Sequence, residues 1–372
     1  MVSITTERLT APKRLLYGPG PSMVDERALE AMKQPALGIR DPYFLQVINE
    51  VRAGLRSAFG TSNRQTFPIP SSGSGAMETA IANFVRPGSK FAIFAAGHFA
   101  DRAAIMAARQ GAVVAKLDKP WGEVFTQAEA EAFIGQERPD VVCFVQAETS
   151  TGAYQSGRLI APAARAAGAL VIADTVTSLG AMPVELDEIG IDVAYSCSQK
   201  GLSCPAGLSP FSLSSRAWDQ LTARGEDGRS WYFDLKLMAQ YYDPPHAYHH
   251  TPSPPLFYAM HEGLAVIEEE GLSARWARHE AAGDQLIRGL TKLGFTPLVK
   301  NAEDRVWHVA TVMPPDGVDE AELRKRLMDR YQVEIAGGLG RLAGKVIRIG
   351  VMGPLAEPDS VKFLLDSIGS CL

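Results

Sequence analysis

The sequence predicts an α/β protein: a large domain built on a doubly wound, mostly parallel sheet, followed by a smaller C-terminal α+β domain. Two observations support this prediction. The chain of 372 residues exceeds the usual size of a single hydrophobic core. Short, wholly apolar segments alternate with helical patterns, which is typical of parallel strands that helices cover on both faces. We therefore expect an N-terminal arm over residues 1–20, a large domain over 21–260 and a small domain over 261–372.

The N-terminal part begins with an irregular arm that ends in a turn-rich Gly-Pro-Gly-Pro run at residues 18–21. Residues 22–25 fit a capping box, which opens a first helix. Asp followed by Pro at residues 41–42 predicts the start of a second helix, because Asp caps helices and proline suits the first helical position. The apolar face of the first helix would consist of Ala28, Leu29 and Met32.

The central part alternates between strands and helices. Wholly apolar runs predict buried strands at residues 91–94, 112–115, 141–145 and 170–173. Helical patterns lie between them, near residues 100–110, 126–135 and 161–167. Ligands of such folds collect where parallel strands end, so we expect the functional site at the carboxyl edge of the sheet.

The pattern changes towards the C-terminus. Aromatic and proline-rich sequence over residues 231–255 precedes a long helical region, roughly 257–294. The smaller α+β unit follows, with candidate strands near 305–313 and 345–351 and candidate helices near 318–330 and 359–369.

Composition and charge exclude several classes of protein. A net charge of −5 gives no general attraction for nucleic acid or for an anionic membrane surface. No run approaches 18 apolar residues, so we expect no membrane partner. The four cysteines show no CxxC spacing, which favours reduced thiols. We therefore expect a cytoplasmic protein, and the C-terminal residues 369–372 are not the SKL peroxisomal signal.

A Ser/Gly-rich loop over residues 71–78 follows a strand-like run at 67–70 and opens a helix. Small residues let backbone N–H groups approach an anion, and the helix dipole adds positive charge there. Taken alone, the loop fits a phosphate-binding site and a flexible turn about equally well. It is not a P-loop, because no GK[ST] follows. It is not the dinucleotide fingerprint either, because Glu78 stands in place of the third glycine.

Two charged residues follow at predicted strand ends. Asp174 ends the apolar run at 170–173, where a buried carboxylate needs a positive partner, although this residue type also caps turns. Lys200 follows the strand-like run at 192–196. Desolvation there would lower its pKa and make the amine a nucleophile, although most single lysines are solvated.

The ordered combination is more specific than its parts. Pyridoxal phosphate requires an anchor for its phosphate, a carboxylate beside its pyridine nitrogen and an amine for its aldehyde. The loop at 71–78, Asp174 and Lys200 supply these three groups in sequence order. We therefore predict a pyridoxal-phosphate enzyme in which Asp174 keeps the ring nitrogen protonated and Lys200 carries a proton.

The chain resembles the class V aminotransferases of fold type I, and most closely the alanine–glyoxylate and serine–glyoxylate (serine–pyruvate) group. The resemblance implies that Lys200 forms the Schiff base and that Asp174 pairs with the pyridinium nitrogen. The matching segments cover nearly the whole chain in the family's order: residues 17–22, 72–76, 148–152, 173–174, 195–200, 248–251 and 344–350.

The resemblance also implies a homodimer with shared active sites, because part of each site belongs to the neighbouring subunit. It implies phosphate ligands in Ser74, Gly75, Ala76 and Gln199, a ligand of the ring hydroxyl in Thr149, a stacking ring in Phe99, a substrate-carboxylate ligand in Arg348, and ligands of the neighbouring subunit's phosphate in Tyr248 and Thr251.

The implied reaction transfers an amino group from alanine or serine to glyoxylate or pyruvate. Two alternatives of the same fold remain, an (S)-ureidoglycine–glyoxylate and a pyridoxamine–pyruvate aminotransferase. The second handles free pyridoxamine and does not need Ser74, Tyr248 and Thr251 as phosphate ligands. The sequence departs from serine-using relatives around Arg40 and has Ala76 where histidine or tryptophan is common nearby, which leaves the amino donor open.

Three other functions explain the residues less well. A cysteine desulfurase has histidine before the lysine, where this chain has Gln199. A non-enzymatic nucleotide-binding protein leaves Asp174, Lys200 and Arg348 unexplained. Adjacent histidines at 249–250 show no third ligand in the sequence, so we expect no metal site.

Overall fold

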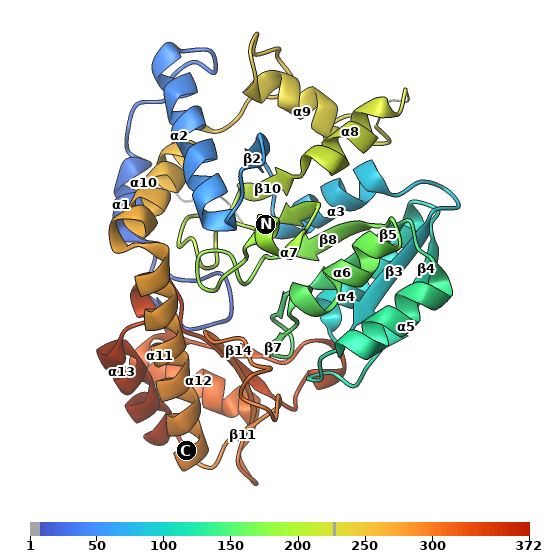
Figure 1. Ribbon diagram of the computed structural model, residues 1–372. Helices are drawn as coiled ribbons and strands as arrows, with labels where there is room; N and C mark the ends of the chain where they lie inside the picture. Colours follow the sequence, from blue (N-terminus) through green and yellow to red (C-terminus); the bar gives the residue numbers. More distant parts are fainter. Residues whose placement is uncertain (1–7, 226–227) are drawn as a thin grey trace, which may run out of the picture.

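The computed structural model describes residues 8–225 and 228–372. Its central feature is a seven-stranded sheet (Figure 1). Every strand is parallel to the others except β10, which is antiparallel to both of its neighbours. The predicted α/β class with a mostly parallel sheet is confirmed. Across the sheet the order is β2 (Gln65–Ile69), β10 (Ser209–Leu213), β9 (Val193–Tyr195), β8 (Leu170–Asp174), β5 (Val141–Val145), β3 (Lys90–Ala95) and β4 (Val113–Asp118).

The apolar runs correctly predict the buried strands in the middle of this sheet, but not the strands at or next to its edges. Strands β5 and β8 are buried along their whole length, as their uninterrupted apolar sequence predicts. Strand β4 is one of the two edge strands, and its residues are exposed or half-buried, so the expectation that both faces are covered there was wrong. Strand β10 was missed because its sequence includes Ser209 and Ser212. The Ser212 hydroxyl lies 2.9 Å from that of Thr66 on β2 and stays buried.

Helices cover both faces of the sheet. The connections β2–α3–β3 and β3–α4–β4 run one way across it, whereas β4–α5–β5 and β5–α6–β8 run back. Since such crossovers are right-handed, the two directions place their helices on opposite faces. Helices α3 and α4 pack together, as do α5 and α6. Their bounds are α3 (Gly73–Phe84), α4 (His98–Arg109), α5 (Gln127–Glu137) and α6 (Ala161–Ala166).

Further helices surround this core, and α1 and α2 both pack against α10 (Figure 1). The Asp41 side chain caps α2, accepting hydrogen bonds from the Tyr43 and Phe44 backbone N–H groups, as predicted. The remaining elements of the large unit are α1 (Glu26–Ala31), α2 (Pro42–Phe59), α7 (Leu186–Ile189), α8 (Ser215–Ala223), α9 (Leu235–Tyr242), α10 (Pro254–Glu270) and the hairpin β6 (Ala147–Glu148) and β7 (Ala153–Tyr154).

The prediction for the first helix was partly wrong. Asp25, not Ser22, caps α1. The Ser22 hydroxyl instead donates to the Lys200 carbonyl oxygen at 2.8 Å, a long-range contact that local sequence does not reveal. Leu29 was expected on the buried face and is 48% exposed.

A second hydrophobic core forms the C-terminal unit. Helix α10 contributes to the first core and α11 to the second, and the chain changes direction between them at Gly271. The boundary expected at residue 260 falls inside α10, and the division into domains stays a prediction. This unit contains α11 (Leu272–Lys292), α12 (Glu320–Tyr331), α13 (Pro358–Gly369) and an antiparallel sheet in the order β11 (Thr296–Pro297), β12 (Val309–Met313), β15 (Ile347–Gly350) and β14 (Ala336–Gly337).

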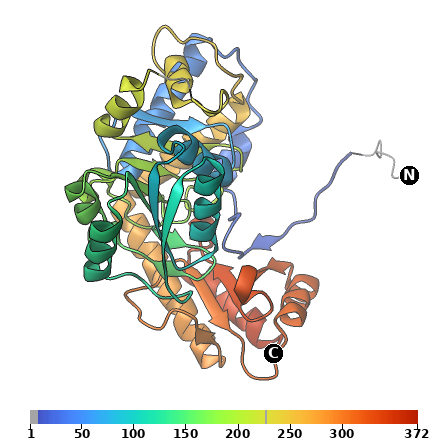
Figure 2. The same cartoon turned by 90° about the vertical axis from the view of Figure 1, so that its right-hand side faces the viewer.

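The described part of the N-terminal arm reaches away from the body of the molecule, and residues 8–13 are exposed (Figure 2). Further along, β1 (Leu15–Leu16) pairs in parallel with β13 (Val333–Glu334) of the C-terminal unit. Among the described residues, no helix has the length and hydrophobicity that a membrane crossing needs.

Two glycine substitutions test how closely α11 packs. Gly283 faces the backbone carbonyl of Trp307 so closely that an added Cβ would overlap it. Gly283→Ala should therefore lower the free energy of unfolding by about 1–3 kcal/mol. The matched control is Gly135→Ala on α5, where nothing lies within 4 Å. This change should raise stability by about 0.5–1 kcal/mol, since alanine favours helix. Urea unfolding measures both, and a Gly283→Ala midpoint equal to wild type would contradict the packing.

Candidate active site

Predicted site residues follow the carboxyl ends of the parallel strands, which meet at one edge of the sheet. Far-apart stretches of sequence are thereby brought to the same place. Ser74 follows β2, Phe99 follows β3, Thr149 follows β5, Asp174 ends β8 and Lys200 follows β9.

The Lys200 side chain is buried at this edge, and its Nζ donates to the Pro19 carbonyl oxygen. Burial, above all, lowers the pKa of Lys200 to about 8, with Arg348 acting in the same direction and Cys197 and Asp174 opposing it. A neutral amine is therefore accessible near physiological pH, which is the form that attacks a carbonyl.

The backbone around Lys200 is held from two distant parts of the chain. From the N-terminal segment, Ser22 N donates to the Gln199 carbonyl and Ser22 Oγ to the Lys200 carbonyl. From α11, the buried Arg275 donates to the carbonyl oxygens of Gly180 and Gly201, each at 2.8 Å. These contacts fix the loop that carries the amine.

Asp174 lies buried at the end of β8, where one carboxylate oxygen accepts a hydrogen bond of 2.9 Å from the Val176 backbone N–H. Burial raises the pKa of the Asp174 carboxyl to about 7. A carboxylate in this position needs a cationic neighbour to stay charged at neutral pH, which a protonated ring nitrogen supplies.

The Ser/Gly loop opens α3 as predicted, with the helix beginning at Gly73. Its N-cap, Ser72, makes no side-chain capping bond, so the first-turn N–H groups are free of that partner. An added Cβ on Gly75 would lie 2.7 Å from Ser71 Cβ, so the turn requires glycine there. This geometry suits an anion at the helix N-terminus.

Glu148 is a buried acid that the sequence interpretation left without a role. Its carboxylate accepts hydrogen bonds from the backbone N–H groups of Phe99 and Ala100, at 3.1 and 3.4 Å, and from the Ser150 hydroxyl at 2.6 Å. Burial raises the pKa of Glu148, and these hydrogen bonds act to lower it. The acid thus caps α4 from a distant segment and positions Phe99. The sequence did hold one indication of this role: Glu148 directly precedes Thr149, in the segment 148–152 that matches the class V family.

Arg348 is buried on β15 and reaches the same edge from the C-terminal unit. Its guanidinium donates to the Gly337 carbonyl at 2.8 Å and to the Thr149 carbonyl at 3.2 Å. The Thr149 hydroxyl in turn pairs with the Thr177 hydroxyl, and the Thr177 carbonyl accepts from the buried His308 ring. Residues predicted for the cofactor and for the substrate are therefore in direct contact.

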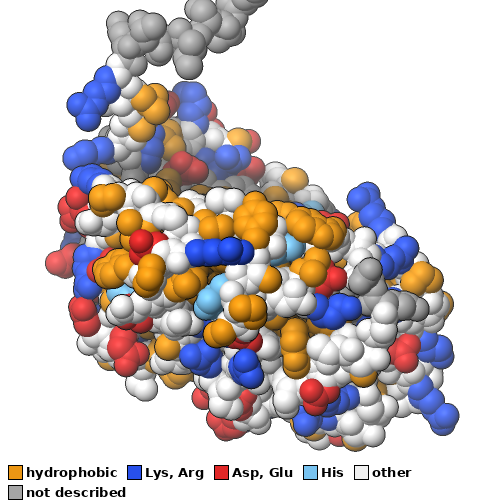
Figure 3. Space-filling model, turned by 90° about the horizontal axis from the view of Figure 1, so that it is seen from above, with side chains coloured by type: hydrophobic (Ala, Val, Ile, Leu, Met, Phe, Trp, Pro, Cys, Tyr) orange, Lys and Arg blue, Asp and Glu red, His pale blue; other side chains and the backbone are white. Residues whose placement is uncertain are grey.

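The two residues expected to act across subunits, Tyr248 and Thr251, lie on the surface, as does Arg40. Tyr248 is 61% exposed, and its hydroxyl lies 3.3 Å from that of Thr251, also exposed. Arg40 and Tyr248 line the same open hollow. Trp231 and Tyr232 are exposed nearby and pack around His249. Figure 3 shows hydrophobic side chains gathered beside lysines and arginines on the face seen from above.

The adjacent histidines bind each other rather than forming a cluster of ligands. His249 Nδ1 lies 2.8 Å from His250 Nδ1, and His249 Nε2 lies 3.1 Å from the Trp231 carbonyl. Over residues 8–225 and 228–372, no group of three His, Cys, Asp or Glu side chains is placed to hold a metal ion.

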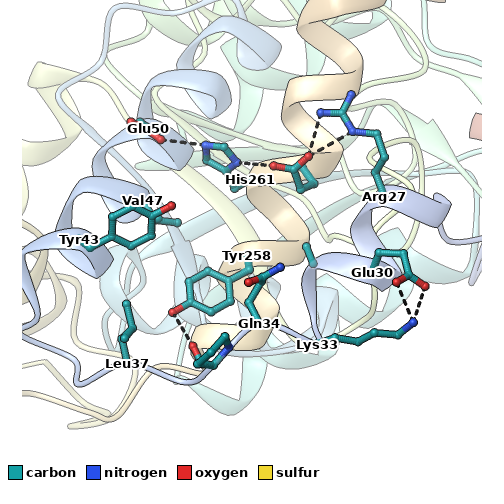
Figure 4. A pocket seen from close by; sticks show the side chains of 13 residues that line it. Arg27, Glu30, Lys33, Gln34, Leu37, Tyr43, Val47, Glu50, Tyr258 and His261 are labelled. Carbon is teal, nitrogen blue, oxygen red and sulfur yellow. Dashed lines mark hydrogen bonds and ion pairs between the residues drawn. The ribbon is translucent and has the colours of Figure 1, made fainter.

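A separate cavity of about 790 Å³ lies between α1, α2 and α10 (Figure 4). Its charged side chains neutralise one another. Arg27 pairs with Glu262 at 2.8 Å, Lys33 with Glu30 at 2.6 Å, and the His261 ring lies 2.8 Å from Glu50. None of the predicted site residues lines this cavity.

A glycine close to Lys200 offers a test of this geometry. Gly20 has φ +131°, and an added Cβ would overlap Lys200 Cε and Nζ. Gly20→Ala should therefore displace the amine and weaken the absorption change that follows addition of pyridoxal phosphate, the cofactor expected from the resemblance. Gly18→Ala, where nothing lies within 4 Å, is the control and should respond as wild type. An unchanged response in a folded Gly20→Ala protein would refute this placement of Lys200.

Comparison with known proteins agrees with this geometry. Residues 16–349 match the model of the family Aminotransferase class-V. The chain is 37% identical to an alanine–glyoxylate aminotransferase of Drosophila melanogaster, covering 98% of this chain and 93% of that one. It is 33% identical to an (S)-ureidoglycine–glyoxylate transaminase of Bacillus subtilis, covering 98% and 92%. The crystal structure of an alanine–glyoxylate aminotransferase from Nostoc sp. superposes with a TM-score of 0.96, at 42% identity over 99% of this chain and 97% of that one. The chain belongs to the class V aminotransferases, enzymes of fold type I that use pyridoxal phosphate.

Proposed function

We propose that this transaminase moves the amino group of a small amino acid, alanine or serine, to glyoxylate or pyruvate. The observation that supports it most strongly is the contact between the Arg348 guanidinium and the Thr149 carbonyl, because Arg348 is expected to bind the substrate carboxylate and Thr149 the cofactor. The alanine–glyoxylate relatives, similar over nearly the full chain, support the choice of substrates.

The residues present fit the cofactor. Asp174 needs a cationic partner to stay charged, because burial raises the pKa of its carboxyl to about 7. The first turn of α3 lacks a side-chain cap, and Gly75 leaves no room for a Cβ. The ring nitrogen of pyridoxal phosphate would supply the positive charge that Asp174 needs, and its phosphate would accept from the free N–H groups of α3.

The roles of the residues follow from their positions. Ser74, Gly75, Ala76 and Gln199 would hold the phosphate, Phe99 would face the ring and Thr149 its hydroxyl. When bound, pyridoxal phosphate supplies an electron-withdrawing ring that stabilises negative charge at the substrate Cα. Asp174 would hold the proton on the ring nitrogen. Lys200 Nζ would take the proton from the substrate Cα, a base suited to neutral pH because its pKa is lowered to about 8.

Arg348 would orient the substrate. A guanidinium binds a carboxylate through two parallel hydrogen bonds, which fixes the angle at which the Cα–H bond meets Lys200. Since Arg348 and Lys200 are both buried, water is largely excluded from the reacting atoms and the electrostatic interactions there are strengthened.

The experiment that tests this function is a stopped-flow half-reaction. Alanine and serine, mixed separately with the loaded enzyme, should bleach the visible absorption of the bound cofactor, and glyoxylate should restore it. Lys200→Ala is the control and should show no such exchange, because it lacks the base. If neither amino acid bleaches the band, the proposed donors are wrong. Bleaching by ureidoglycine alone would favour the ureidoglycine reaction, which the Bacillus subtilis relative supports as a second candidate.

We also propose that the enzyme is a homodimer whose subunits share their active sites. The exposed Tyr248 and Thr251 hydroxyls, near the exposed aromatic rings of Trp231 and Tyr232, support a role outside their own chain. Apolar, aromatic surface of this kind is typical of an interface.

Mixing two inactive variants tests this arrangement. In a hybrid dimer, the Tyr248→Ala chain still supplies Lys200 and the Lys200→Ala chain still supplies Tyr248. These two residues meet in one of the two sites, which is therefore intact, whereas the other site lacks both. Random exchange of subunits should thus restore about a quarter of the wild-type sites, measured by cofactor bleaching. Recovery no greater than the sum of the separate variants would contradict the sharing of sites.

A further inference from the structure

Arg102 on α4 makes three contacts at the candidate active site, none of which the sequence predicted. Its Nη1 donates to the Ser74 hydroxyl at 2.7 Å. Its guanidinium carbon lies 4.9 Å from the centre of the Phe99 ring. Its Nη2 lies 3.2 Å from His98 Nε2. One side chain therefore joins the loop predicted to bind phosphate to the ring predicted to stack on the cofactor.

The contact with Ser74 decides what that hydroxyl can do. A serine hydroxyl has one proton and two lone pairs. Because Arg102 donates to one lone pair, the Ser74 proton is left to point towards another acceptor. Ser74 stands in the first turn of α3, where backbone N–H groups also favour an anion. The contact thus leaves the Ser74 hydroxyl free to donate to an anion, and the nearby positive charge of Arg102 strengthens that hydrogen bond.

The contact with Phe99 adds a further restraint to a ring that already packs against the hydrophobic core and the His98 ring. The backbone N–H of Phe99 is held by Glu148, and the guanidinium lies over one face of its half-buried ring. Cation–π contacts of this kind are worth about 0.5–2 kcal/mol, which is enough to bias the rotamer.

His98 completes the arrangement. Burial and then the charge of Arg102 lower the pKa of His98, so the ring is neutral near physiological pH. A neutral imidazole has one unprotonated nitrogen, and Nε2 is the one that can accept from Arg102. This second hydrogen bond, at Nη2, fixes the orientation of the guanidinium and keeps Nη1 directed at the Ser74 hydroxyl.

We propose that Arg102 is a further cofactor-positioning residue, which orients Ser74 for the phosphate of pyridoxal phosphate and holds Phe99 against its ring. This inference rests on the assignment of the site to that cofactor. It predicts that losing Arg102 weakens recognition of the phosphate more than recognition of the pyridine ring.

Binding of two ligands to the apoenzyme, pyridoxal phosphate and unphosphorylated pyridoxal, separates these effects. In Arg102→Gln the Kd of pyridoxal phosphate should rise about tenfold or more, the value of a hydrogen bond to a charged group. The Kd of pyridoxal should rise less, so the preference for the phosphorylated ligand falls. Arg102→Lys, which retains the charge, should recover part of that preference. Arg109→Gln, an exposed residue of the same helix, is the matched control and should bind both ligands as wild type.

A double-variant cycle shows whether Arg102 acts through Ser74. If it does, the double variant Ser74→Ala/Arg102→Gln should lose less binding free energy for pyridoxal phosphate than the sum of the losses in the two single variants. Equal losses for both ligands in a folded Arg102→Gln protein, or no loss at all, would overturn the inference. Failure of the wild-type apoenzyme to prefer pyridoxal phosphate over pyridoxal would instead overturn the assignment of the cofactor site.

Discussion

Lys200 and Asp174 are both buried at one edge of the sheet, where neither side chain keeps its ordinary protonation behaviour. Burial lowers the pKa of the lysine to about 8 and raises that of the aspartate to about 7. The two shifts bring a basic amine and an acidic group into the same range of pH. Burying both groups costs stability, which the burial of apolar side chains in the hydrophobic cores offsets.

The contacts that hold the pair come from separate parts of the chain. The N-terminal segment contributes Ser22, α11 contributes Arg275, and β15 brings Arg348 against the Thr149 carbonyl. Gly20 leaves the space that the Lys200 side chain occupies. The C-terminal unit and the N-terminal segment both contact this edge, so residues from both ends of the chain complete the site.

The sequence allowed most strands of the large sheet, the α/β class and the order of the chemical groups to be predicted, since apolar runs and strand-end positions are local patterns. Other features depend on tertiary contacts. The capping role expected of Ser22 belongs to Asp25, because Ser22 bonds the distant Lys200 loop. Strand β10 has serines at two of its five positions, and its neighbours bury it along its whole length. Glu148 contacts Phe99 from a distant segment, and Arg102 contacts it from the next helical turn, so neither contact shows in the sequence around Phe99.

The central claim is that Lys200 is the amine that binds the cofactor. Borohydride reduction of the loaded protein fixes the cofactor to the lysine that holds it, and peptide mass spectrometry then identifies that residue. The account predicts a pyridoxyl group on the peptide that contains Lys200 and its absence in Lys200→Ala. Stoichiometric labelling of any other lysine, with Lys200 unmodified, would contradict it.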